Sequence, residues 1–223
     1  MTTKERQGEK ERNILVLGIP RGGVTVAEVV SKKLSCEFDI VIPRKLGAPF
    51  NKELAIGAVI EDGTTYLNHD IIAQLEISQE YIEKEKSEQI EEIKRRKALY
   101  HGTPISNDKE EDSEKKQDAI DNKNKIKGRT VILVDDGIAT GATTIAAARW
   151  IKIHEPKYLI IAAPIATKEI SDLLKKEADE VEIITTPPSY KFKSVAQFYQ
   201  DFKPVEDKEI MKILQKRSPI NQR

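Results

Sequence analysis

The chain has 223 residues, with 37 lysines and arginines balanced by 37 aspartates and glutamates, so its formal net charge is zero. Neutrality argues against a general binder of nucleic acids or membrane surfaces, and no apolar run approaches the length of a membrane span. A chain of this size suits one α/β domain with appendages, and its single cysteine excludes an intrachain disulfide framework. Residues 1–12 are a charged tail without the apolar core of a signal peptide, so we expect a cytoplasmic protein.

The first predicted strand covers residues 13–19 and leads into the turn Pro20-Arg21-Gly22-Gly23, after which a helix is expected to residue 34. An unbroken apolar run of this length is typical of a strand buried on both faces of a parallel sheet. Taken alone, the turn is only a tight bend. It lacks the Gly-x4-Gly-Lys-Ser/Thr pattern of a P-loop, which disfavours nucleotide hydrolysis.

A second strand is predicted over residues 38–43, ending at Arg44 and Lys45. These two cations suit either a solvated strand end or a ligand-facing pair. The glycines, proline and charges that follow predict a mobile excursion, until residues 55–61 pair back. An Asp-Gly hairpin signal then precedes a returning strand over residues 64–67.

The middle of the chain is dominated by charged residues. Capping residues predict helices over 69–76 and 78–100, whose thin apolar stripe favours an accessory helical flap (69–100) rather than a separate domain. Residues 101–127 lack periodicity and are dense in Asp, Glu, Lys, Asn and Ser. They predict a solvated, partly disordered charged linker without catalytic chemistry.

The most informative stretch is residues 130–148, TVILVDDGIATGATTIAAA, in which an apolar strand ends at Asp135 and Asp136. Open α/β sheets bind ligands at the carboxyl ends of their strands, so the acidic pair is expected at a ligand site. The glycine- and threonine-rich turn offers backbone N–H groups at the start of the next helix, which suits a phosphate. The carboxylates repel anions, and they fit ribose hydroxyls or water bound to Mg²⁺ instead.

Residues 131–143 resemble the phosphoribosyl-pyrophosphate (PRPP) motif of type I phosphoribosyltransferases, with Gly137 replacing the branched apolar residue usual there. That departure should loosen the entrance of the loop. The succession GIPRGG, PRKLGAP and DDGIATGAT resembles a subgroup of predicted phosphoribosyltransferases whose accepting substrate is largely unassigned.

Two further strands, predicted over 157–164 and 181–185 with a helix between them, complete a doubly wound parallel sheet of about five strands. The antiparallel excursion corresponds, by resemblance, to the flexible-loop hairpin that closes over PRPP. The predicted organisation is therefore an α/β phosphoribosyltransferase core over residues 13–186, with a helical insertion. A small C-terminal hood and a helix follow over residues 187–223.

The resemblance also implies roles for individual residues. The expected PRPP-binding residues are Pro20, Arg21, Gly22, Gly23, Asp135, Asp136, Gly137, Ala139, Thr140, Gly141, Ala142 and Thr143. The expected catalytic residues are Asp135, Asp136, Arg21, Arg44 and Lys45. Asp135 and Asp136 are also expected to hold Mg²⁺ through water, and the peptide bond entering Arg21 is expected to be cis.

Aromatic residues gather in the predicted hood, where five of the chain's twelve fall within thirteen residues. They are Tyr190, Phe192, Phe198, Tyr199 and Phe202. The resemblance implies that the hood supplies the acceptor pocket, with Tyr190 and Phe192 as the acceptor-binding rings. The alternative is that the rings pack the hood onto the core or form a dimer contact.

By resemblance, the protein transfers phosphoribosyl from PRPP to a small nitrogenous acceptor, a nucleobase in the favoured interpretation, and releases pyrophosphate. Mg²⁺ is the expected cofactor, nucleotide metabolism the expected setting and a homodimer the expected assembly. The rival hypothesis is a non-catalytic regulator of the same fold that senses PRPP. PRPP synthesis is disfavoured because the sequence carries no ATP-binding signature.

Overall fold

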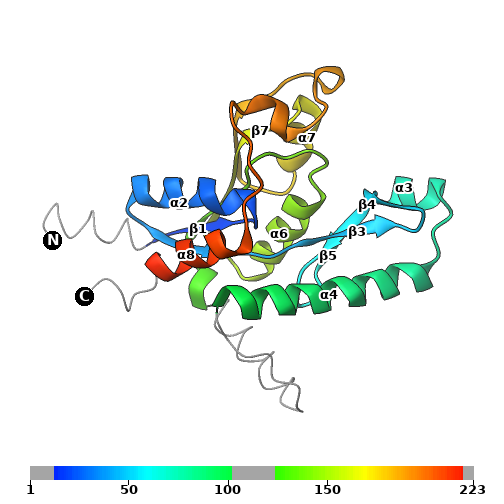
Figure 1. Ribbon diagram of the computed structural model, residues 1–223, viewed down its shortest axis with the longest axis horizontal. Coiled ribbons are helices and arrows are strands. Elements are labelled where there is room, and N and C mark those ends of the chain that lie inside the picture. The colour runs from blue at the N-terminus through cyan, green and yellow to red at the C-terminus, as the bar shows by residue number, and fades with distance from the viewer. Residues whose placement is uncertain (1–12, 102–123, 218–223) are drawn as a thin grey trace, which may run out of the picture.

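The computed structural model describes residues 13–101 and 124–217 (Figure 1). Its central sheet has five parallel strands in the order β2-β1-β6-β7-β8. They are β1 (Ile14–Gly18), β2 (Glu37–Ile40), β6 (Thr130–Val134), β7 (Tyr158–Ile165) and β8 (Glu180–Thr185). The chain runs from β1 outward to β2 and later resumes at β6 on the other side of β1. This order confirms the predicted doubly wound sheet and opens a crevice beyond the carboxyl ends of β1 and β6.

Alternating apolar residues along the strands bury both faces of the central sheet. Val16 and Val134 pack against α2 (Gly22–Leu34) on one face. Leu133, whose side chain points the opposite way, packs with α6 (Ala142–Ile153) and α7 (Lys168–Leu174). Helices on both faces are what near-continuous apolar strands require.

A second, antiparallel sheet extends to one side of the central sheet (Figure 1). It contains β3 (Arg44–Ala48), β4 (Asn51–Val59) and β5 (Thr65–Leu67), in that order. The strand predicted over 38–43 is confirmed as β2, but it ends earlier, at Ile40, and Arg44 and Lys45 begin β3 of the other sheet. The residues predicted as an excursion after Lys45 form an antiparallel hairpin, with shifts of register on both sides of Gly47 and a turn at Pro49 and Phe50.

The predicted helical flap consists of α3 (His69–Gln74) and α4 (Gln79–His101), both capped as expected. The Asn68 side chain accepts from the Ile71 N–H at 3.2 Å, and the Ser78 hydroxyl accepts from the Tyr81 N–H at 3.2 Å. Helix α4 runs along the second sheet rather than over the central one (Figure 1). Its Ile82 and Ile93 are buried in a second core.

The C-terminal part consists of the hood, residues 187–206, and helix α8 (Asp207–Arg217). Ile210 and Ile213 of α8 join the second core, so the chain returns to the flap after crossing the central sheet. Most of the predicted charged linker, residues 102–123, lies outside the described residues. Its last part, residues 124–126, forms a helical turn whose Ile126 side chain is buried in the main core. Within the described ranges, no helix is long and apolar enough to span a bilayer.

Candidate active site

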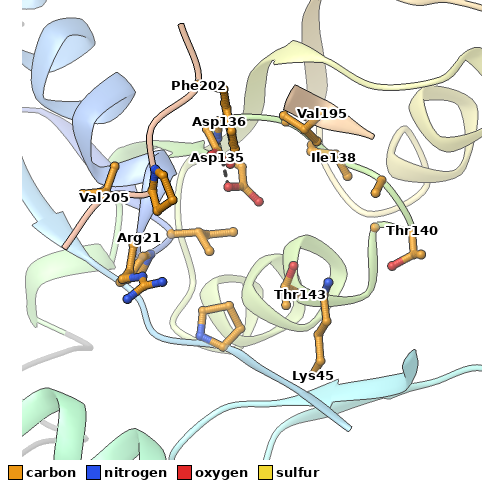
Figure 2. A pocket seen from close by; sticks show the side chains of 18 of the residues that line it. Arg21, Lys45, Asp135, Asp136, Ile138, Thr140, Thr143, Val195, Phe202 and Val205 are labelled. Carbon is orange, nitrogen blue, oxygen red and sulfur yellow. Dashed lines mark hydrogen bonds between the residues drawn. The ribbon is translucent and has the colours of Figure 1, made fainter. Parts of the chain in front are cut away.

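A cavity of about 400 Å³ lies beyond the carboxyl ends of β1 and β6, at the reversal of strand order (Figure 2). Four segments line it: the turn after β1, the loop after β6, the start of β3 and part of the hood. The lining residues are Ile19, Pro20, Arg21, Gly22, Pro43, Lys45, Asp135, Asp136, Gly137, Ile138, Ala139, Thr140, Gly141, Thr143, Val195, Phe202, Lys203, Pro204 and Val205. The topology therefore brings two distant sequence motifs to one site.

The turn after β1 is held very close to the loop after β6. A Cβ added to Gly22 would overlap the Asp136 carboxylate, and one added to Gly23 would lie 2.8 Å from the Val134 carbonyl oxygen. Gly23 therefore allows a close approach of the backbone, and Gly22 leaves room for the Asp136 side chain. The Pro20–Arg21 peptide bond is cis, as expected. The Arg21 side chain is exposed at the rim of the cavity.

The loop after β6 carries the two adjacent carboxylates. The Asp136 N–H donates to Asp135 Oδ1 at 2.9 Å, which fixes their relative orientation. Burial, and then the neighbouring Asp136 charge, raise the pKa of Asp135 well above its ordinary value. Asp135 nevertheless keeps an accessible edge on the cavity. A cation or hydroxyl donors placed there would stabilise its charged form.

The same loop ends in an anion-binding geometry. Gly141, at φ 79°, is the N-cap of α6, and Ala139, Thr140 and Thr143 line the cavity beside it. A left-handed backbone at this point favours glycine. Free N–H groups and the positive end of the helix dipole suit a phosphate group.

The acidic pair fits a hydrated divalent cation. Among the residues that the structure describes, no group of three or more His, Cys, Asp or Glu side chains could hold a metal ion. A magnesium ion would therefore take ligands from the two neighbouring carboxylates, directly or through water, and its other ligands from a bound substrate.

The hood closes one side of the cavity. Val195 and Phe202 line it, and the Tyr199 hydroxyl donates to the main-chain carbonyl of Asp136 at 2.5 Å. The space that a side chain on Gly137 would need is filled by Val195 and Ile165. Gly137 was expected to loosen the loop entrance. That expectation stays a prediction, and the structure adds that the missing side chain leaves room for Val195 of the hood.

The predicted cations and aromatic rings are divided between the cavity and other places. Lys45 points into the cavity, whereas the Arg44 Nε donates to Gln89 of α4 at 3.0 Å and does not line it (Figure 2). Phe192 stacks on Phe198, with centroids 5.6 Å apart, and Tyr190 is 81% exposed. Neither Tyr190 nor Phe192 lines the cavity.

Of the predicted PRPP-binding residues, Gly23 and Ala142 are buried directly behind the lining and all the others contribute to it. Sequence reasoning missed several lining residues: Ile19, Pro43, Ile138, Val195, Phe202, Lys203, Pro204 and Val205. Ile19, Pro43 and Ile138 lie within the three quoted motifs but were given no role, and Phe202 was marked only as a member of the aromatic cluster. Residues 203–205 follow no pattern that marks a binding site.

A doubly wound sheet with an arginine turn, an acidic pair and an anion-binding loop at its reversal point defines the class of type I phosphoribosyltransferases. The model of the phosphoribosyl transferase domain family matches residues 2–203, and the chain belongs to this family.

Two curated relatives come from Mycobacterium tuberculosis: "Putative phosphoribosyl transferase MT0597" of strain CDC 1551 / Oshkosh and "Putative phosphoribosyl transferase Rv0571c" of strain H37Rv. Each is 35% identical over 201 residues, or 90% of this chain and 41% of the relative. The chain thus spans less than half the length of these relatives. The crystal structure of TT1426 from Thermus thermophilus is similar at a TM-score of 0.67. Its sequence is 34% identical, with 93% of this chain and 89% of that chain covered.

Proposed function

We propose that this protein transfers the phosphoribosyl group of PRPP to a nitrogenous acceptor, such as a nucleobase, and releases pyrophosphate. The observation that carries the proposal is the meeting of three groups in one cavity. These are the arginine turn at residues 20–22, the acidic pair and the phosphate loop at residues 139–143. The spacing along one cavity suits a ligand with phosphate at both ends and a ribose between them.

Each segment has one task in this reaction. The phosphate loop holds the 5′-phosphate at the N-terminus of α6. Asp135 and Asp136 hold the ribose hydroxyls and fix C1 in line with the acceptor. Arg21 and Lys45 stabilise the negative charge that grows on pyrophosphate as the C1–O bond breaks and the acceptor nitrogen bonds to C1. Mg²⁺, held by substrate and the acidic pair, would add positive charge at the leaving diphosphate.

The acceptor would lie against the hood, because the other walls are used for PRPP. Phe202 is the aromatic side chain that lines the cavity within the described residues, and it replaces Tyr190 and Phe192 as the stacking candidate. Enclosure by the hood and by β3 would keep water from a reactive ribosyl cation.

A thermal-shift measurement tests the first step. PRPP at about one hundred times its dissociation constant stabilises the folded state by ~2.7 kcal/mol, which raises the midpoint of a chain of this size by about 5–10 °C. The shift should require Mg²⁺ and shrink in Asp136→Asn. Absence of any shift at millimolar PRPP would overturn the proposal.

Pyrophosphate release then separates an enzyme from a sensor. Wild-type protein is mixed with Mg²⁺, PRPP and, in turn, purines, pyrimidines and other nitrogen bases. Turnover with any of them supports the transferase. Binding of PRPP without pyrophosphate release across the panel would favour the non-catalytic PRPP-sensing alternative.

A further inference from the structure

The Val195 side chain packs directly against Gly137, in the space that a side chain at position 137 would occupy. A Cβ on Gly137 would overlap Val195 Cγ1 and would lie 2.7 Å from Ile165 Cγ2. Ile165 belongs to β7 and is 1% exposed, so it has little freedom to move. Val195 lies in a short 3-10 turn of the hood, Val195–Phe198, and also lines the cavity. Any side chain at position 137 would therefore push the hood.

A hydrogen bond from the hood joins the same peptide unit. Tyr199 donates its hydroxyl to the Asp136 carbonyl oxygen at 2.5 Å, while its ring contacts Phe202 at a centroid distance of 5.2 Å. The Asp136 carboxylate lies against Gly22 of the arginine turn. Asp136 is therefore the residue at which the turn after β1, the loop after β6 and the hood meet.

The peptide between Asp136 and Gly137 needs such an anchor. Glycine accepts a wider range of backbone angles than other residues, so this peptide unit could rotate without a steric penalty at position 137. Because the peptide is planar, fixing the carbonyl oxygen also fixes the direction of the Gly137 N–H. Tyr199 holds the carbonyl, and Val195 packs against Gly137 where a Cβ would lie.

We propose that Val195, which packs on Gly137, and Tyr199, which donates to the Asp136 carbonyl, form a hood latch. The latch positions Asp136 relative to the hood, against which the acceptor would lie. They are positioning residues that act through the Asp136–Gly137 peptide. The ligand assignments rest on the proposed function, whereas the latch itself is a property of the free protein. A ligand held by Asp136 should depend on the latch, and one held only by the arginine turn should not.

The first test needs no ligand. Hydrogen–deuterium exchange is compared in wild type, Tyr199→Phe and the matched control Tyr190→Phe, which removes a hydroxyl from an exposed tyrosine of the same segment. Loss of one hydrogen bond should speed exchange in residues 192–205 about threefold to tenfold in Tyr199→Phe. The control and the β7 peptides should stay unchanged. Equal exchange in the two variants would overturn the latch.

The second test asks whether the latch positions Asp136. Calorimetry gives the dissociation constants of Mg²⁺-PRPP and of metal-free pyrophosphate, which carries no cation to join it to the acidic pair, for the same variants. Tyr199→Phe should weaken PRPP about threefold to tenfold and leave pyrophosphate within about twofold. An equal loss for both ligands, or no loss for either, would refute the positioning role. If wild type itself binds no PRPP, the proposed function fails, and the exchange experiment still decides the latch.

A pair of compensating substitutions tests the contact between Gly137 and Val195. Gly137→Ala should weaken PRPP binding and speed hood exchange, and adding Val195→Ala should restore part of both losses by making room for the new Cβ. The restoration should be incomplete, because the new Cβ would still lie too close to Ile165. Losses in the double variant equal to the product of the single losses would show that the two positions do not act together.

Discussion

The two sides of the cavity are built in different ways. On the side of the central sheet, the contacts leave no space for added side chains: Gly22 lies against the Asp136 carboxylate and Gly23 against the backbone at the end of β6. On the opposite side, the hood lies over the same loop through one tyrosine hydroxyl and one valine, and Phe202 remains 41% exposed. Under the proposed function, the closely packed sheet side would hold PRPP, and the hood side would receive the acceptor.

Helix α4 of the helical flap contacts β3 near its first residues and the segment after the hood near its last residues. Near its start, Glu85 is buried, pairs with Lys52 and accepts from the Gly47 N–H at 3.3 Å, which holds β3 and therefore Lys45 in place. At its other end, the Tyr100 hydroxyl donates to Asp207 Oδ1 at 2.7 Å, directly after the hood. Burial and the Asp207 carboxylate raise the pKa of Tyr100 to about 12, so this donor keeps its proton at neutral pH. One helix thus contacts both the strand that carries Lys45 and the residue that follows the hood.

The largest effect is expected on the sheet side. Gly22→Ala places a Cβ where the Asp136 carboxylate lies, so the carboxylate must leave its position. Losing a charged contact to the ribose should weaken Mg²⁺-PRPP binding about tenfold to a hundredfold. Calorimetry measures this loss, and circular dichroism checks that the variant folds. A Mg²⁺-PRPP affinity of Gly22→Ala close to that of wild type would contradict the proposed tight fit between Gly22 and Asp136 on the sheet side.

A second expectation concerns the pH dependence of the acidic pair. The pKa of Asp135 is raised in the folded state, mainly by burial, so the folded protein holds a proton that the unfolded chain has released. The free energy of unfolding should therefore fall as pH rises from the ordinary aspartate pKa to the raised one. Asp135→Asn removes this dependence, and its stability advantage over wild type should grow with pH.

Urea unfolding at several pH values between about 4 and 7 measures that advantage, with and without Mg²⁺. A bound cation stabilises the charged carboxylate, so Mg²⁺ should reduce the difference between variant and wild type. A stability difference that is constant with pH would contradict the raised pKa. One that is insensitive to Mg²⁺ would argue against the acidic pair as a metal site.

The contrast between the two sides also explains how far the sequence could predict the structure. Strand, acidic pair and phosphate loop are consecutive, so the local pattern determined their place at the carboxyl end of β6. The early end of β2 was not predicted because the apolar run continues through Val41 and Ile42. Strand β3 was not predicted because its glycine and charged residues resemble a loop. The roles within the hood were not predictable. Its short 3-10 turns, Ser189–Lys191 and Val195–Phe198, have no long periodicity that would reveal which side chains face inward.

The smallest effect is expected on the hood side, where the acceptor KM of variants at two aromatic residues can be compared. Phe202 lines the cavity, whereas Tyr190 is 81% exposed outside it. Stacking contributes about 0.5–1.5 kcal/mol beyond area burial, so Phe202→Leu should raise the KM of an acceptor found in the base screen about twofold to tenfold. PRPP affinity should hardly change, because Asp135, Asp136 and the phosphate loop remain intact. Tyr190→Leu is the matched control and should alter neither value. Loss of PRPP affinity in Phe202→Leu would mean that Phe202 acts by supporting Tyr199, whose ring it contacts, and not by stacking on the acceptor.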